Sequence, residues 1–483
     1  MSHCSTLQAP AQATCPSEIV APRRPLAVAA PARSPAVARP RHRGWPAALL
    51  LPALLALSGH AAAQRTDLLA IYRDAVASDP VFASARAAQL AAAERTPQAR
   101  AALRPNVSAG LSASLMDSNY RTDFGRLTQT YNSWGPVLQA TWPLYRPQLS
   151  DAVSQAQLAV TQSEAQLAQT RQDLILRVTQ GYFDVLASRD ALEALGASKQ
   201  AVGENLAQAK REFEVGTKTI VDTHEAQARY DQIVAQEQVA LGDLIVKKSA
   251  LEAIIGRDPG DLLTLRDAPQ LDQPQPPAMQ EWVRRTDDGN FNVAFARAGA
   301  QIAQLETTRA RDGRKPTVDL TGSLGVQRGS GTATTSEFYT QRSASIGVQL
   351  SVPLYTGGLI DSRVREALAN EEKARQDLET ARRNAAQNAR QAFTGVDYGL
   401  AQVRALESAE VSAKSQLDST RLGYQIGVRI NLEVLDATTQ LFNTQRDLKK
   451  ARYDFLVNGL RLKSAAGVLE EQDLAAINAL LAR

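Results

Sequence analysis

The chain reads Phe213-Glu214-Val215-Gly216-Thr217-Lys218 and, 211 residues later, Tyr424-Gln425-Ile426-Gly427-Val428-Arg429. An offset of 210 or 211 residues also separates other pairs of similar segments. These are Arg104-Pro105-Asn106-Val107 with Lys315-Pro316-Thr317-Val318, Trp142-Pro143-Leu144-Tyr145 with Val352-Pro353-Leu354-Tyr355, and Ala85-Arg86-Ala87 with Ala296-Arg297-Ala298. A constant offset indicates two copies of one structural unit. We predict a first repeat over residues 64–275 and a second over residues 276–483.

Residues 1–63 have the composition of an export signal. Arg39, Arg41 and Arg43 precede an apolar run from 45 to 57, and the small residues 61–63 follow. A positive flank, a short apolar core and small residues are typical of a secretory signal peptide. The run is too short for a membrane helix. Cleavage is therefore predicted before Gln64, and a retained apolar anchor is the alternative.

The leader also accounts for the formal net charge of +4. It holds six of the 54 basic and one of the 50 acidic side chains, so 48 basic and 49 acidic side chains remain. No basic excess is left to bind nucleic acid. Cys4, Cys15 and three of the four histidines lie in the leader as well, which leaves only His224. The exported chain then has no disulfide, metal cluster, catalytic triad or cofactor motif, and we predict no enzyme.

Two pairs of strands are predicted from alternating side chains, at about 106–117 and 133–145, and at about 317–328 and 343–355. In the first strand Val107, Leu111 and Leu115 alternate with serine and glycine. Polar loops are predicted at 118–132 and 329–342. Ten to twelve tilted residues match the thickness of an outer-membrane barrel, and aromatic residues at strand ends fit the membrane boundary. A soluble sheet with one buried face is the alternative.

Short helices are predicted within 67–103, and very long helices at about 148–256 and 358–468. Apolar residues recur there every three or four positions, and both stretches lack proline. Gly216 and Gly427 mark the turn in each long helical stretch. The narrow, alanine-rich apolar stripe favours coiled-coil packing, and a soluble helical bundle is the alternative. Five prolines within 257–277 make that segment a linker between the repeats.

Four strands cannot close a barrel in lipid, where unpaired backbone groups are costly. Three copies of the chain would supply 12 strands, and two copies would supply eight with an interior filled by side chains. A conduit favours three. The predicted fold is therefore an α+β membrane protein: a trimeric 12-stranded transmembrane β-barrel, with four strands per chain, continued by a long α-helical periplasmic barrel.

Several segments are similar to the TolC family of outer-membrane efflux and type I secretion channels. They are 423–429, 434–439, 451–453, 471–474 and 352–358, and the resemblance covers about Asp67 to Arg483. The resemblance implies a homotrimer in the outer membrane that extends into the periplasm. It also implies a constriction at the periplasmic tip, which the family holds shut through a tyrosine and an arginine of the second repeat.

The positions that match this gate are Tyr424, Arg429 and Asp222, the last being the acceptor for the arginine. Val221 and Arg211 depart from the family, which has threonine and glutamine there, so Tyr424 is expected to meet a cation. Glu433 and Asp436 match two acidic rings of the family. They lie three residues apart on one helix face, and such rings favour cations and allow block by multivalent cations.

The predicted function is a passive exit duct of a type I secretion system that exports a protein such as a repeats-in-toxin cytolysin. The alternative is the outer-membrane component of a tripartite multidrug efflux pump, and a further alternative is a periplasmic helical scaffold or adaptor. The implied partners are outer-membrane lipid, a periplasmic adaptor of the membrane fusion type, an inner-membrane ABC or proton-driven transporter, and an exported protein or small molecule.

Overall fold

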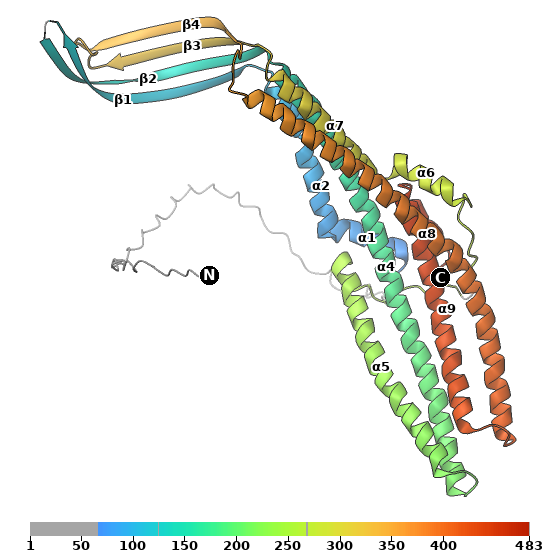
Figure 1. The fold of residues 1–483 in the computed structure, drawn as a ribbon. Coiled ribbons are helices and arrows are strands. Elements are labelled where there is room, and N and C mark those ends of the chain that lie inside the picture. Colours follow the sequence, from blue (N-terminus) through green and yellow to red (C-terminus); the bar gives the residue numbers. More distant parts are fainter. Residues whose placement is uncertain (1–65, 124, 267–268, 483) are drawn as a thin grey trace, which may run out of the picture. The chain divides into compact units, whose positions relative to one another are not determined.

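A sheet at one end and two long helical hairpins organise the chain (Figure 1). The computed structural model describes residues 66–123, 125–266 and 269–482, which belong to one unit, Ala62–Arg483. The predicted signal segment and its cleavage site lie outside the described residues. Among the helices described, none combines the length and the apolar composition needed to cross a membrane.

The order of short helices, two strands and two long helices occurs twice. The first set comprises α1 (Leu68–Ser78), α2 (Pro80–Ala93), α3 (Arg95–Ala101), β1 (Asn106–Thr122), β2 (Gly125–Tyr145), α4 (Pro147–Glu214) and α5 (Ile220–Ile255). The second comprises α6 (Met279–Gly289), α7 (Phe291–Asp312), β3 (Thr317–Gly329), β4 (Tyr339–Ser351), α8 (Leu359–Gln425), α9 (Asn431–Ala465) and α10 (Glu471–Asn478).

The four strands form one antiparallel sheet in the order β1-β2-β3-β4. Leu138 lies between Ala109 and Leu324 on one face of the sheet. On the other face Gln139 lies between Ser108 and Ser323. The register thus collects the apolar side chains of four strands on one face, and these side chains are exposed in the single chain: Leu111 is 74% and Ile346 is 81% exposed. Such a face needs a cover of lipid or protein.

The predicted loop at 118–132 is wrong, because β1 and β2 continue through most of it and turn only between Thr122 and Gly125. Polar side chains stabilise this extension across the hairpin. The Arg126 Nε donates to Asn119 Oδ1 at 2.7 Å, and the Thr130 hydroxyl donates to Asp117 Oδ1 at 3.1 Å. Polar cross-strand pairs stabilise a ladder without an apolar pattern.

The last predicted strand, 343–355, differs from β4 at both ends. β4 begins earlier, at Tyr339, and ends at Ser351, where it pairs with Thr317, the first residue of β3. Beyond that point β3 offers no partner. Pro353 also lacks an N–H for a ladder hydrogen bond. Val352 to Tyr355 therefore lead out of the sheet toward α8.

The helices α4 and α8 have 68 and 67 residues. At 1.5 Å per residue each is about 100 Å long. They carry the turns that precede α5 and α9 to the end of the molecule opposite the sheet (Figure 1). Midway, a buried core forms where α4 and α9 pack, with Phe183 stacked on Tyr453 at 5.2 Å between ring centroids. This core fixes how the two helical hairpins are aligned along their length.

An ion pair with a buried carboxylate joins the start of α2 to α4. Asp79 is buried, caps α2 through the N–H of Phe82, and accepts hydrogen bonds from the Arg177 guanidinium at 2.8 and 3.2 Å. Burial opposes the ionised form, but the bonds from Arg177 and Phe82 outweigh it and hold the pKa of Asp79 below its ordinary value.

Because the pKa of Asp79 is lowered on folding, its ionised form contributes stability above its unfolded pKa, and this contribution is lost as the pH falls through the folded pKa. The substitution Asp79→Asn keeps the helix cap but removes the charge. At neutral pH we expect it to lower the free energy of unfolding by about 1–2 kcal/mol. The difference from wild type should shrink below about pH 4. Thermal unfolding followed by circular dichroism would measure both. A difference that stays constant down to acidic pH would contradict the assignment.

Candidate gate at the helical turns

The two helical hairpins end in turns built alike. Gly216 and Gly427 have φ angles of +75° and +78°, a conformation that suits glycine. After the first turn Thr219 and Asp222 form a capping box at the start of α5, with the Thr219 hydroxyl 2.8 Å from Asp222 Oδ2. The Asp222 carboxylate therefore caps its own helix, where the helix dipole favours a negative charge.

Tyr424, in the last turn of α8, joins the second hairpin to the first. Its side chain is only 7% exposed, and its hydroxyl donates to Glu212 Oε2 of α4 at 2.8 Å. The Lys218 ammonium lies 4.5 Å from the centroid of the Tyr424 ring, within reach of a cation–π interaction. Burial, with the bond to Glu212, raises the pKa of the Tyr424 hydroxyl, which stays protonated and available as a donor.

The tyrosine thus meets a cation, but that cation is Lys218. Arg211 instead turns back along α4, and its Nε donates to the carbonyl of Ala207 at 3.2 Å. Glu212, the carboxylate that accepts the hydrogen bond of Tyr424, was not predicted. Its position in the sequence, directly after Arg211 and one helical turn before Gly216, could have indicated that Glu212 lies at the turn.

Arg429 lies just after the second turn and pairs within its own segment. Its Nη1 is 2.7 Å from Glu433 Oε2, one helical turn further along α9. A side chain at Gly423 would place its Cβ 2.6 Å from Arg429 Cγ, so this glycine makes room for the arginine. Within one chain Arg429 and Asp222 are engaged by different partners. The predicted Arg429–Asp222 bond is therefore not formed within the single chain and stays a prediction.

Two further contacts tie the hairpins together near the turns. Asn431, fully buried at the start of α9, accepts from the Asn205 amide of α4 at 2.7 Å and donates to the carbonyl of Asp222 at 3.4 Å. One turn further, Asp436 of α9 pairs with Arg229 of α5. Neither Asn431 nor Arg229 was predicted, because no local pattern links residues more than 200 positions apart.

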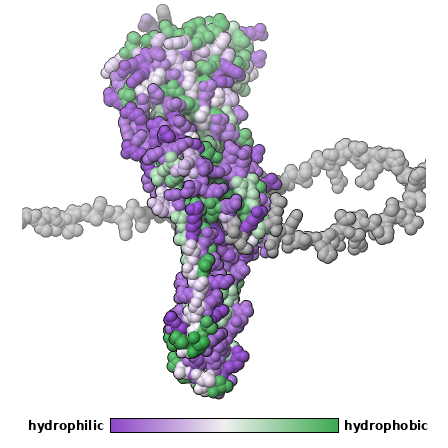
Figure 2. Space-filling view, turned by 90° about the vertical axis from the view of Figure 1, so that its right-hand side faces the viewer, coloured by the Kyte–Doolittle hydropathy of each residue, from purple (hydrophilic) through white to green (hydrophobic). Residues whose placement is uncertain are grey.

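Several apolar side chains are exposed at the turns. Figure 2 shows hydrophobic side chains (green) near the turn end of the molecule. The exposed residues there include Val215, Val221, Ile426, Val428 and Ile430. Exposed apolar side chains gathered at a tip favour contact with another protein.

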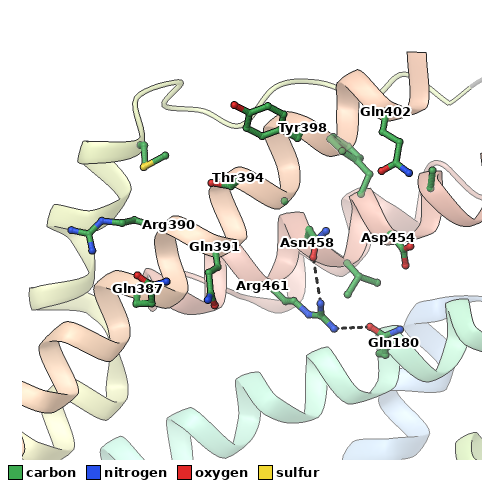
Figure 3. A pocket seen from close by; sticks show the side chains of 16 residues that line it. Gln180, Gln387, Arg390, Gln391, Thr394, Tyr398, Gln402, Asp454, Asn458 and Arg461 are labelled. Atoms are coloured by element: carbon green, nitrogen blue, oxygen red, sulfur yellow. Dashed lines mark hydrogen bonds between the residues drawn. The ribbon is translucent and has the colours of Figure 1, made fainter. Parts of the chain in front are cut away.

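A groove of about 940 Å³ lies far from the turns, between α8 and α9 (Figure 3). Arg461 points across it toward α4, where its Nη2 donates to Gln180 Oε1 at 2.9 Å. The other polar residues on its walls are four amides, Gln387, Gln391, Gln402 and Asn458, together with Arg390, Thr394, Tyr398 and Asp454. In the described ranges, no three histidine, cysteine or acidic side chains gather as metal ligands.

A four-stranded sheet with one apolar face, joined to long helical hairpins that are tied together at their turns, defines an outer-membrane channel protein. The model of the outer membrane efflux protein family matches residues 71–257 and 282–468. The chain belongs to this family, whose members are channels and not enzymes.

Curated relatives and solved structures agree with this assignment. The chain is 33% identical to the outer membrane protein TolC of Escherichia coli, over 90% of this chain and 89% of that protein. It is 30% identical to the alkaline protease secretion protein AprF of Pseudomonas aeruginosa, over 85% and 86%. Protein CyaE of Bordetella pertussis is 26% identical over 48% of this chain and 49% of that protein.

Among solved structures, the Campylobacter jejuni CmeC outer membrane channel matches with a TM-score of 0.73 at 16% identity, covering 86% of this chain and 89% of that one. At this identity the match concerns the fold. Together with the relatives, it identifies an outer-membrane protein of the TolC type whose helices extend into the periplasm.

Proposed function

We propose that three copies of this chain form the outer-membrane exit duct of a type I secretion system. The observation that carries the proposal is the sheet, with its exposed apolar face and its outer strands β1 and β4, each paired on one side only in the single chain. Open edges do not persist in lipid, because each unpaired backbone group costs several kcal/mol. Pairing β4 of one copy with β1 of the next would give a closed 12-stranded barrel, with the polar face lining the lumen.

The helical hairpins of three copies would continue this barrel as a periplasmic tube. We assign the apolar tip around Val215, Ile426 and Val428 to the periplasmic adaptor. The adaptor in turn would connect the duct to an inner-membrane ABC or proton-driven transporter, which supplies the energy. The duct itself stays a passive channel.

The tube would be closed at the turns. Tyr424, Arg429 and Asp222 form the gate in this proposal, with Arg211 behind them, and Glu433 and Asp436 line the constriction. Opening moves α5 and α9 outward about Gly216 and Gly427. The Asn431 contacts resist that movement, because they tie α9 to α4 and α5. The Tyr424–Glu212 bond holds the ends of α8 and α4 together at the same level.

A protein cargo is supported by the similarity to AprF, whose name describes protease secretion. A repeats-in-toxin cytolysin is one such cargo. A multidrug efflux role is the second candidate, because the family is described by efflux and the chain is similar to TolC. Deleting the gene separates the two: loss of a protein from the culture medium supports secretion, and sensitisation to dyes and detergents supports efflux.

The assembly itself gives a direct test. The protein extracted from outer membranes in mild detergent is expected to have the mass of three chains by native mass spectrometry, and its migration on gels should change on heating. A trimer closed by strand pairing has no free edges, so it should resist dissociation. A single water-soluble chain in the periplasmic fraction would instead support the scaffold or adaptor alternative.

A further inference from the structure

Both carboxylates of the proposed pore constriction are already paired with arginines of the same chain. Glu433 pairs with Arg429, and Asp436 pairs with Arg229. Sequence spacing alone places only the two acids together, because Glu433 and Asp436 lie three residues apart on one helix. Arg229 is 207 residues from Asp436 and approaches it from α5.

The two arginines differ in how firmly they are held. Arg429 is 58% exposed at the turn, and its bond to Glu433 is a one-turn surface pair, which contributes little. The side chain of Arg229 is 27% exposed and helps line a small cavity between the hairpins, where its Nη1 also contacts Gln232 Oε1 at 3.5 Å. Arg446, on the same cavity, is paired with Asp447. Arg229 is therefore the cation placed to stay beside Asp436.

We propose that Arg229 is a specificity-determining residue that neutralises the acidic ring of the constriction. The proposal rests on the proposed pore function. In three copies, six carboxylates would face six guanidinium groups, so the ring has almost no net charge. An uncompensated ring of carboxylates attracts cations and holds multivalent ones. With Arg229 in place, the duct is only weakly selective for cations and is poorly blocked by multivalent cations. A weak field suits cargo of either charge.

The test is a planar-bilayer recording of the purified trimer. Arg229→Gln removes the guanidinium and leaves a polar side chain of similar reach. It should shift the reversal potential in a salt gradient toward cation selectivity. It should also lower the lanthanum concentration for half-block on the order of tenfold, because each restored carboxylate charge attracts a trivalent ion strongly. Arg229→Lys should keep wild-type selectivity.

Two controls separate the possible failures. Arg375→Gln breaks an exposed pair with Glu372 on α8, far from the turns, and should change neither reading. Asp436→Asn added to Arg229→Gln should cancel the gain in lanthanum block. If Asp436→Asn and Glu433→Gln reduce block in the wild type while Arg229→Gln changes nothing, the role of Arg229 is overturned and the acidic ring stands. If none of these substitutions alters selectivity or block, the placement of the constriction in the proposed function fails as well.

A gain in block that persists in the double variant would also overturn the role of Arg229. The charge sensed by lanthanum would then lie elsewhere than on Asp436. Trimer assembly, measured on the same preparations by native mass spectrometry, shows whether each variant is folded.

Discussion

Replacing Leu111 by arginine is expected to abolish assembly of the protein in the outer membrane. Leu111 is 74% exposed and lies in the middle of the apolar stripe of β1, between Val107 and Leu115. An arginine on the lipid face of a barrel costs about 2–4 kcal/mol near the bilayer midplane. A trimer would incur this cost three times, which is comparable to the whole stability of a typical domain.

The measurement is the amount of heat-modifiable trimer in the outer-membrane fraction. Ser112→Arg is the matched control, because the neighbouring side chain points to the polar face opposite Gly135. In the proposed barrel that face lines a wide lumen, which accepts a charge, so Ser112→Arg should assemble. If Leu111→Arg assembles and Ser112→Arg does not, the apolar face of the sheet does not face the lipid. The proposed assignment of the two faces to lipid and lumen would then be wrong.

Tyr424→Phe is expected to open the closed channel. The exchange removes the hydroxyl that donates to Glu212 and keeps the ring beneath Lys218. A hydrogen bond to an ionised acceptor contributes about 1.5–3 kcal/mol. Loss of one such bond per chain should raise the open fraction at least about tenfold, since about 1.4 kcal/mol corresponds to a factor of ten.

Single-channel conductance in planar bilayers measures this effect. Glu212→Gln should also raise the open fraction, but by less than Tyr424→Phe, because a neutral amide oxygen still accepts the hydrogen bond. Tyr398→Phe, on an exposed part of α8, is the matched control and should leave the conductance at its wild-type value. Arg429→Ser should add to Tyr424→Phe if Arg429 reaches Asp222 of a neighbouring copy. Wild-type conductance in Tyr424→Phe would remove Tyr424 from the gate.

Some of the structure could not be read from local patterns for identifiable reasons. The segment 118–132 looks like a loop because it is polar, yet it pairs as strand through contacts such as Arg126 with Asn119. Val137 is apolar at a position where the alternation of its strand predicts a polar side chain. It lies on the polar face, where Gly110 and Gly325 of the neighbouring strands leave room for its methyl groups. In both cases the deciding partner is on another strand.

The sequence by itself determined the alternation of the strands, the length of the helices and the turns at Gly216 and Gly427. These are properties of neighbouring residues, since side-chain period and backbone conformation act over a few positions. Only the tertiary structure decided that Tyr424 donates to Glu212, that Asn431 donates to the carbonyl of Asp222, and that Arg229 faces Asp436. Such pairs depend on how α4, α5, α8 and α9 are rotated against one another, and that rotation is set by packing between residues 200 positions apart.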